Sequence, residues 1–141
     1  MDPMMLVKDW MNPQPLTVKP ETTLAEAKAM MARYWIRHLL VLEDGALVGI
    51  FSDRDLRTAS LPAGLEFPAA AREVQLERAA VGDAMTRNPQ TIRPDVTLLE
   101  VARLILEHRF SALPVVDGDR LVGIITETDI VRAFIKLAEP K

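Results

Sequence analysis

The stretch that decides the fold is Gly123-Ile-Ile-Thr-Glu-Thr-Asp-Ile-Val131, or GIITETDIV. It begins with apolar residues typical of a buried strand, reaches Thr126, and carries Asp129 three residues later. Threonine is a preferred N-cap residue, and a carboxylate in the first turn interacts favourably with the helix dipole. The stretch therefore predicts a strand that passes directly into a helix. Helix capping is sufficient to explain Thr126 and Asp129, so their spacing alone does not indicate a site.

The same pattern occurs earlier in the chain, where residue n matches residue n+74 without a gap. Leu47-Val-Gly-Ile50 returns as Leu121-Val-Gly-Ile124, and Asp55 returns as Asp129. Further identical pairs are Val7 and Val81, Asp9 and Asp83, Met11 and Met85, Pro15 and Pro89, Thr17 and Thr91, Pro20 and Pro94, and Thr23 and Thr97. A register kept from residue 7 to residue 59 predicts two copies of one structural unit.

Each copy has the same predicted order of elements. A short extended piece between two prolines precedes a Thr-x-x-Glu capping box, which opens an amphipathic helix. Two apolar strands joined by an Asp/Gly turn follow, and a last helix starts at serine or threonine. These elements start at Thr17 and Thr91, Thr23 and Thr97, Leu39 and Leu113, Ala46 and Leu121, and Ser52 and Thr126. The sequence therefore predicts an α/β (α+β) protein of two β-α-β-β-α repeats.

Three regions follow from this pattern. Residues 1–60 are repeat 1, residues 61–78 are a connector, and residues 79–141 are repeat 2. Glycine and serine are scarce in the connector and its neighbourhood, so we expect an ordered segment with a helix over residues 69–80. Burial is expected for five of its apolar side chains: Leu61, Leu65, Phe67, Val74 and Leu76.

Composition excludes several classes of function. The 141 residues carry a net charge of −3, which argues against a surface for nucleic-acid backbones. The chain has no cysteine, which excludes disulfides, thiol catalysis and thiolate metal sites. No apolar run approaches the roughly 20 residues of a membrane span, and Asp2, Lys8 and Asp9 interrupt any signal-peptide pattern. The sequence predicts a soluble cytoplasmic protein without a membrane partner.

The repeated motifs resemble a known family. The motifs are Val-x-Asp-x-Met, Pro-x-Thr, a capped helix, a strand such as Leu113-Pro-Val-Val116, and Gly-Ile-Ile-Thr-x-x-Asp. Over residues 5–60 and 79–135 they are similar to a tandem pair of cystathionine-beta-synthase (CBS) domains. Ser52-Asp-Arg-Asp-Leu-Arg57, followed by Thr58-Ala-Ser60, also resembles the CBS half of acetoin-utilisation-type regulatory proteins.

The resemblance implies a fold and a class of ligand. Paired CBS repeats pack with pseudo-twofold symmetry into one CBS-pair module, whose clefts between the repeats bind AMP, ADP, ATP or S-adenosylmethionine. By position, Asp55 and Asp129 would accept hydrogen bonds from the ribose hydroxyls. Ser52 and Thr126 would contact ribose or phosphate beside the amides of the helix start.

The resemblance also implies where the base and phosphates would lie. The base would contact main-chain groups of two strand segments in each copy: Arg37, His38, Leu39, Thr17 and Val18 in the first, and Ser111, Ala112, Leu113, Thr91 and Ile92 in the second. Arg37, His38 and Arg54 are the phosphate candidates of the first copy, whereas the equivalent Ser111, Ala112 and Thr128 are uncharged. The second copy keeps the family's proline at Pro114, where the first has Leu40. The two sites are therefore predicted to be inequivalent.

Three functions remain open on the sequence. The main hypothesis is a non-enzymatic energy-sensing module with no obligatory cofactor, which binds an adenine nucleotide and signals to an unknown protein effector. The resemblance implies a homodimer that pairs through residues 54–59 and 130–137. The alternatives are a ligand-free dimerisation scaffold, whose aspartates only cap helices, and an unrecognised nucleotide hydrolase. The hydrolase has little support, because no nucleophile-base pair, Gly-rich phosphate loop or metal-ligand cluster is recognisable.

Four further residues have two readings each. Trp10 and Trp35 fit packing in a core or interface as well as stacking on a base. Gly49 and Gly123 lie inside predicted core strands, where a glycine indicates a close approach of backbone or ligand.

Overall fold

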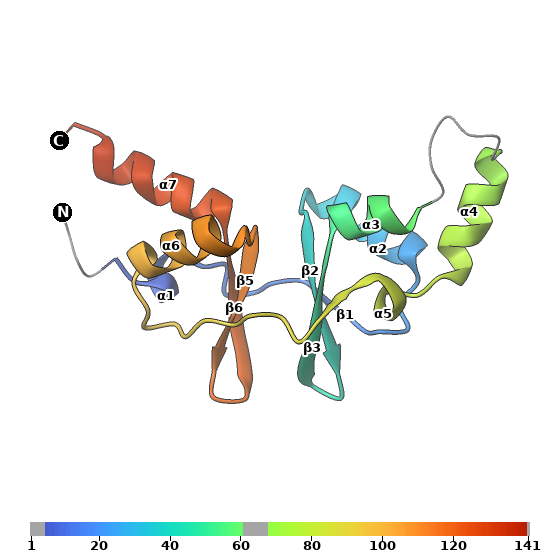
Figure 1. Ribbon diagram of the computed structural model, residues 1–141, viewed down its shortest axis with the longest axis horizontal. Coiled ribbons are helices and arrows are strands. Elements are labelled where there is room, and N and C mark those ends of the chain that lie inside the picture. The colour runs from blue at the N-terminus through green and yellow to red at the C-terminus, as the bar shows by residue number, and fades with distance from the viewer. Residues whose placement is uncertain (1–4, 61–67, 141) are drawn as a thin grey trace. The chain divides into compact units, whose positions relative to one another are not determined.

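The protein is described by a computed structural model, which covers residues 5–60 and 68–140. Figure 1 shows the chain. Its helices are α1 (Val7–Trp10), α2 (Leu24–Tyr34), α3 (Asp53–Ala59), α4 (Ala69–Arg78), α5 (Val81–Ala84), α6 (Leu98–His108) and α7 (Glu127–Ala138). Its strands are β1 (Thr17–Val18), β2 (His38–Glu43), β3 (Ala46–Ser52), β4 (Thr86–Arg87), β5 (Ala112–Asp117) and β6 (Arg120–Thr126). The predicted mixed α/β class and the helix-hairpin-helix order of both repeats are confirmed.

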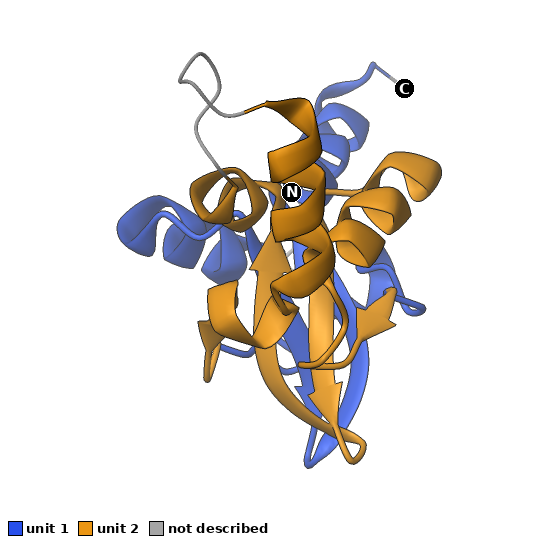
Figure 2. Cartoon of the chain, turned by 90° about the vertical axis from the view of Figure 1, so that its right-hand side faces the viewer, with its two compact units in different colours: residues 1–15, 90–141 blue, residues 16–89 orange. Residues whose placement is uncertain are grey.

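The chain divides into two compact units, coloured separately in Figure 2. Unit 1 comprises residues 1–15 and 90–141, and unit 2 comprises residues 16–89. Each unit therefore holds the body of one repeat and the first helical turn of the other. In unit 1 the Val7 amide of α1 donates to the Val96 carbonyl at 2.9 Å, and in unit 2 the Val81 amide of α5 donates to the Thr22 carbonyl at 2.8 Å. The division of the sequence into residues 1–60, 61–78 and 79–141 stays a prediction. It does not anticipate that α1 and α5 each belong to the unit that is formed mainly by the other repeat.

Unit 2 contains a four-stranded sheet in the order β1-β2-β3-β4. β1 runs parallel to β2, and the other pairs are antiparallel. The β2–β3 hairpin turns at Asp44 and Gly45, which both have positive φ, as a type I′ turn requires. Figure 1 shows α2 and α3 at the end of the hairpin away from this turn. The end of β3 and the start of α3 are therefore brought to the start of β2.

Unit 1 repeats this arrangement, but the segment equivalent to β4 makes only a bridge, between Asn12 and Ile124. Its sheet has two strands, β5 and β6, and the segment equivalent to β1 makes only a bridge between Ile92 and Val115. The expected short strand at Thr91 and Ile92 is therefore absent. The physical reason is Pro114, which has no N–H to donate, whereas the equivalent Leu40 amide donates to the Leu16 carbonyl at 3.2 Å.

The two strand glycines allow a close backbone approach, as expected. A Cβ at Gly123 would lie 2.7 Å from the carbonyl oxygen of Asn12, and one at Gly49 would lie 3.0 Å from that of Thr86. Asn12 and Ile124 exchange two backbone hydrogen bonds of 2.9 and 3.0 Å at this crossing. Glycine thus lets the first turn of one repeat pack beside a strand of the other.

Each unit has its own apolar core. The core of unit 2 consists of Val18, Leu24, Ala27, Met31, Leu39, Val41, Phe51, Leu76 and Val81. The core of unit 1 consists of Val7, Ile92, Leu98, Val101, Leu113, Val115, Ile125 and Ala133. Thr23 and Thr97 accept from the Glu26 and Glu100 amides, which confirms the threonine half of each predicted capping box. No described helix is long and apolar enough to cross a membrane.

Several apolar residues test the burial expectations. Leu76 of α4 is buried as expected, but Val74 on the same helix is exposed because it lies outside the face that packs on α2. Leu61, Leu65 and Phe67 lie outside the described residues. Trp10 packs against the core of unit 1, whereas Trp35 is 95% exposed in a left-handed conformation after α2. Core packing is therefore the right reading for Trp10 and the wrong one for Trp35.

Candidate functional site

The candidate residues of the first copy meet where α3 begins. His38, the first residue of β2, lies opposite Ser52, the last residue of β3. The Asp53 amide, in the first turn of α3, donates to the Arg37 carbonyl at 2.9 Å. These contacts bring the start of β2 and the start of α3 together within unit 2.

Ser52 and Asp55 form a reciprocal cap at this helix start. The Ser52 amide donates to Asp55 Oδ2 at 2.9 Å, and the Asp55 amide donates to Ser52 Oγ at 3.1 Å. Asp55 is partly buried, and its Oδ1 accepts no hydrogen bond from the described residues. One oxygen of a firmly held carboxylate therefore remains open to a hydroxyl donor, which is the chemistry that ribose recognition needs.

The remaining candidates of the first copy border this cap in two ways. Thr17 and Val18 pair with Leu40 and Val41, so β1 runs beside β2. Because Val18 and Leu39 are buried, only their main-chain groups could face a base. Arg37 and Arg54 are exposed, and neither forms an ion pair with another described residue. Two guanidinium groups next to the cap could therefore meet an anion.

The candidate residues of the second copy have the same backbone geometry in unit 1. Ala112, the first residue of β5, lies opposite Thr126, the last residue of β6. The Glu127 amide of α7 donates to the Ser111 carbonyl at 3.1 Å, and the Ile92 amide donates to the Pro114 carbonyl at 3.0 Å. Thr91 directly precedes Ile92 in the chain. Ala112, Leu113 and Pro114 are buried, so this edge carries no charged side chain toward a ligand.

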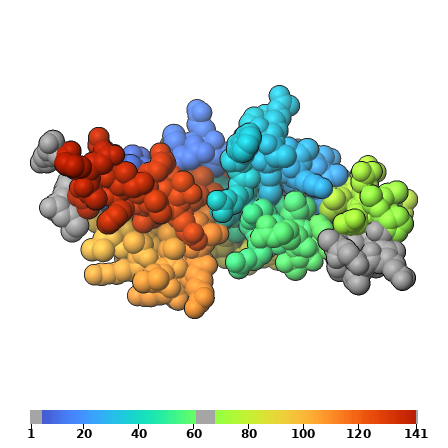
Figure 3. Space-filling model, turned by 90° about the horizontal axis from the view of Figure 1, so that it is seen from above, coloured from blue at the N-terminus to red at the C-terminus, as the bar shows by residue number. Residues whose placement is uncertain are grey.

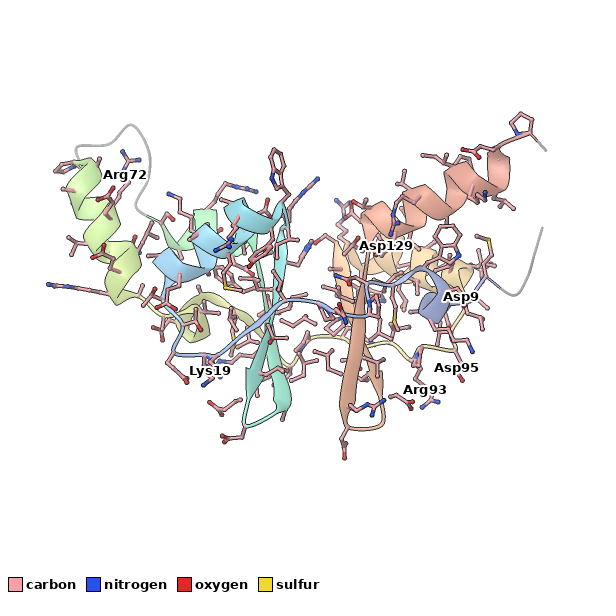
Figure 4. All side chains as sticks on the ribbon, turned by 180° about the vertical axis from the view of Figure 1, so that it is seen from behind. Asp9, Lys19, Arg72, Arg93, Asp95 and Asp129 are labelled. Atoms are coloured by element: carbon pink, nitrogen blue, oxygen red, sulfur yellow. The ribbon has the colours of Figure 1, made fainter. Side chains whose placement is uncertain are left out.

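Asp129 differs from Asp55 in how fully its oxygens are used. The Thr126 amide and hydroxyl both donate to Asp129 Oδ2, at 2.8 and 3.2 Å. The guanidinium of Arg132 pairs with Oδ1 from the next turn of α7. Figure 4 shows Asp129 at the start of α7. With 6% of its surface exposed, Asp129 is the buried charged residue of the described chain.

Sequence reasoning did not identify Arg132. The signal was available, because Asp129 and Arg132 are three residues apart on a predicted helix, a spacing at which side chains meet. The structure thus gathers the first set of candidates in unit 2 and the second set in unit 1. No group of three or more His, Cys, Asp or Glu side chains that could hold a metal was found among the described residues.

Comparison with known proteins identifies the family. The model of the CBS domain matches the chain twice, at residues 7–62 and 81–136. The CBS domain-containing protein CBSX2 of Arabidopsis thaliana, a chloroplastic protein, is 34% identical over 93% of this chain, which spans 64% of the length of CBSX2. The crystal structure of CBSX2 in complex with AMP has a TM-score of 0.77 at 32% identity, with 96% of this chain and 99% of that one covered.

Two other solved structures are equally similar. One is the Vibrio cholerae protein AcuB, described as an acetoin utilization protein, with a TM-score of 0.78, 32% identity, and 97% and 99% of the two chains covered. The other is the CBS domain pair of protein MJ0100 in complex with 5-methylthioadenosine and S-adenosyl-L-methionine, with a TM-score of 0.79, 30% identity, and 96% and 99% covered. The resemblance found in the repeated motifs is confirmed: this chain belongs to the CBS domain family, as a tandem CBS-pair protein.

Proposed function

We propose that this protein is a regulatory module that binds an adenosine-containing nucleotide, AMP, ADP, ATP or S-adenosylmethionine, and signals to a partner by rearrangement. The observation that carries the proposal is the repeated helix-start carboxylate, Asp55 or Asp129. Each is held by its own N-cap residue, which lies opposite the first residue of the neighbouring strand, β2 or β5. Such a carboxylate suits the two hydroxyls of a ribose. Related CBS pairs crystallised with AMP, or with 5-methylthioadenosine and S-adenosyl-L-methionine, support the ligand class.

The phosphate preference should follow the charges of unit 2. Arg37, His38 and Arg54 gather near Ser52 and Asp55, whereas the equivalent positions of unit 1 hold Ser111, Ala112 and Thr128. Guanidinium groups bind phosphate oxygens strongly and with defined geometry. We therefore assign the phosphorylated ligand to the residues of unit 2.

Thermal unfolding tests the proposal. Protein freed of carried-over nucleotide is melted with AMP, ADP, ATP, S-adenosylmethionine and GMP, as wild type, Asp55→Ala and Asp129→Ala. A ligand at about 100 times its Kd adds about 2.7 kcal/mol, which raises the Tm by several degrees. We expect a rise with adenosine compounds that at least one substitution removes. No rise with any of them would contradict ligand sensing.

A ligand acts as a signal only if it binds two arrangements of the protein with different affinity. We propose that the output passes to a partner chain or to assembly with a second copy. The exposed apolar face of α7 supports assembly: Val131, Phe134, Ile135 and Leu137 are each at least 46% exposed. In Figure 3 α7 lies open on the surface of unit 1. We propose a homodimer that uses this face.

Replacing one side chain of this face tests the homodimer. Phe134→Glu places a charge where a second copy would bury an aromatic ring, and we expect the molar mass from light scattering to fall to that of one chain. Lys136→Glu is the matched control, because it adds the same side chain at an exposed polar position of the same helix. A mass that is unchanged in Phe134→Glu would exclude this face as the dimer interface.

A ligand-free dimerisation scaffold is the second candidate. The observation that favours it is that both aspartates already cap their helices, so neither requires a ligand to explain its place. It predicts that Asp129→Ala changes stability alone, by about 1 kcal/mol. A hydrolase would show repeated turnover of ATP that Asp55→Ala removes, and we expect none.

Location in the cytoplasm remains a prediction.

A further inference from the structure

The Arg132–Asp129 ion pair distinguishes the two helix starts. Residues 58 and 132 are equivalent under the 74-residue repeat, and they are Thr58 in unit 2 and Arg132 in unit 1. Thr58 makes no hydrogen bond to Asp55, whereas Arg132 pairs with Asp129 Oδ1. Among the described residues, a cation therefore pairs with the helix-start carboxylate in unit 1 and not in unit 2.

Asp55 and Asp129 differ in how many of their acceptor sites are already occupied by hydrogen-bond donors. An ionised carboxylate offers about four acceptor sites. At Asp129 three donors are already in place: the Thr126 amide, the Thr126 hydroxyl and the Arg132 guanidinium. At Asp55 the single donor among the described residues is the Ser52 amide. Two ribose hydroxyls can be accepted by Asp55 as it stands, but by Asp129 only after a donor leaves.

Of the two residues that supply these donors, Arg132 is the more exposed and is the one whose side chain can move into water. The Thr126 amide is fixed by the backbone at the helix start, whereas the side chain of Arg132 is 58% exposed and that of Asp129 is 9% exposed. A displaced guanidinium regains water, so its release costs little on its own side. The buried carboxylate must at the same time exchange a charged donor for neutral hydroxyls, which are weaker partners.

We propose that Arg132 competes with ribose for Asp129 and so lowers the affinity of unit 1 for every adenosine compound. This inference rests on the proposed function. It identifies Arg132 as a residue that sets the order in which the candidate sites of unit 1 and unit 2 bind ligand. Because the competing donor is partly exposed, removing it should strengthen binding moderately, by about 3- to 10-fold. The gain should not depend on phosphate, because the competition concerns the ribose.

Calorimetric titration with adenosine and with AMP tests this inference. The Asp55→Ala background confines binding to the residues of unit 1, and Arg132→Thr is then added to copy the residue of the other repeat. Lys136→Thr is the matched control, since it removes the same charge from an exposed position of α7. We expect Arg132→Thr to tighten adenosine and AMP binding alike, and Lys136→Thr to change neither.

The reverse substitution extends the test to unit 2. Thr58→Arg, in an Asp129→Ala background, places a guanidinium three residues after Asp55 and should weaken adenosine binding there. Weaker binding of AMP but not of adenosine in Arg132→Thr would show that Arg132 contacts phosphate, and would overturn the inference. Unchanged affinities in Arg132→Thr would overturn it as well, while leaving nucleotide binding established. If neither ligand binds wild type or any variant, the proposed function itself fails.

Discussion

Units 1 and 2 share one backbone plan but differ in what surrounds the helix-start carboxylate. In unit 2 the Ser52–Asp55 cap lies next to exposed arginines, and one carboxylate oxygen of Asp55 has no donor among the described residues. In unit 1 the equivalent Asp129 is more deeply buried and is paired with Arg132. The two copies thus share the geometry of the helix start, and under the proposed function the differing side chains around it would give each copy different ligand contacts.

The core should give the largest effect, and it should be similar in both units. Phe51 and Ile125 are equivalent, and both are fully buried. We expect Phe51→Ala to cost about 3–5 kcal/mol and Ile125→Ala about 2–5 kcal/mol, because each leaves a cavity. Urea unfolding measures both losses. A loss below 1 kcal/mol in either variant would show that the corresponding core is not packed as described.

Substitutions at the equivalent strand residues Leu40 and Pro114 should have a smaller effect on the free energy of unfolding, and this effect should differ between the units. Leu40→Pro removes the amide that donates to the Leu16 carbonyl and also reduces a buried side chain, so we expect a loss of about 2–4 kcal/mol. The reverse change, Pro114→Leu, removes no donor and should cost less than about 1.5 kcal/mol. Equal losses in the two variants, measured by urea unfolding, would contradict the role given to the Leu40 amide.

Replacing Gly123 or Gly49 with alanine should destabilise the protein to different extents, because the backbone approaches the two glycines at different distances. Gly123→Ala puts a Cβ at 2.7 Å from a backbone oxygen, and Gly49→Ala puts one at 3.0 Å, with a methionine sulfur near each. Backbone yields less readily than a methionine side chain, so we expect Gly123→Ala to cost about 1–3 kcal/mol and Gly49→Ala to cost less. The opposite order in thermal unfolding would refute this ranking.

The ion pair that distinguishes unit 1 should matter least for stability. Arg132→Thr should destabilise the protein by less than about 1 kcal/mol, because the guanidinium is largely in water. Raising the salt concentration should reduce the difference from wild type further. A loss well above 1 kcal/mol, insensitive to salt, would mean that Arg132 is a structural residue and not a competitor for ribose.

The sequence predicts the common plan of the two repeats well, for identifiable reasons. The apolar strand runs, the Thr23 and Thr97 caps and the Asp44-Gly45 turn are local signals, and each is found in the structure. The repeat of 74 residues also places both candidate carboxylates correctly at helix starts.

What the sequence leaves open depends on contacts between distant segments. A register of n and n+74 is the same whether α1 packs on its own repeat or on the other one, so the exchange of helical turns has no local signal. The absence of a strand at Thr91 and Ile92 depends on Pro114, which has no amide hydrogen to donate. The sequence shows the proline, but it does not show which carbonyl the missing amide would have met. The Arg132–Asp129 pair had a signal in its spacing, yet spacing does not tell which of several neighbouring charges pair.

We propose that the two candidate sites are inequivalent and that the residues around Asp55 form the stronger one for a phosphorylated ligand. The most direct measurement is calorimetric titration of AMP into nucleotide-free wild type, Asp55→Ala and Asp129→Ala. We expect the tighter binding event to disappear in Asp55→Ala and to persist in Asp129→Ala. Loss of the tighter event only in Asp129→Ala, or equal weakening in both variants, would contradict the account.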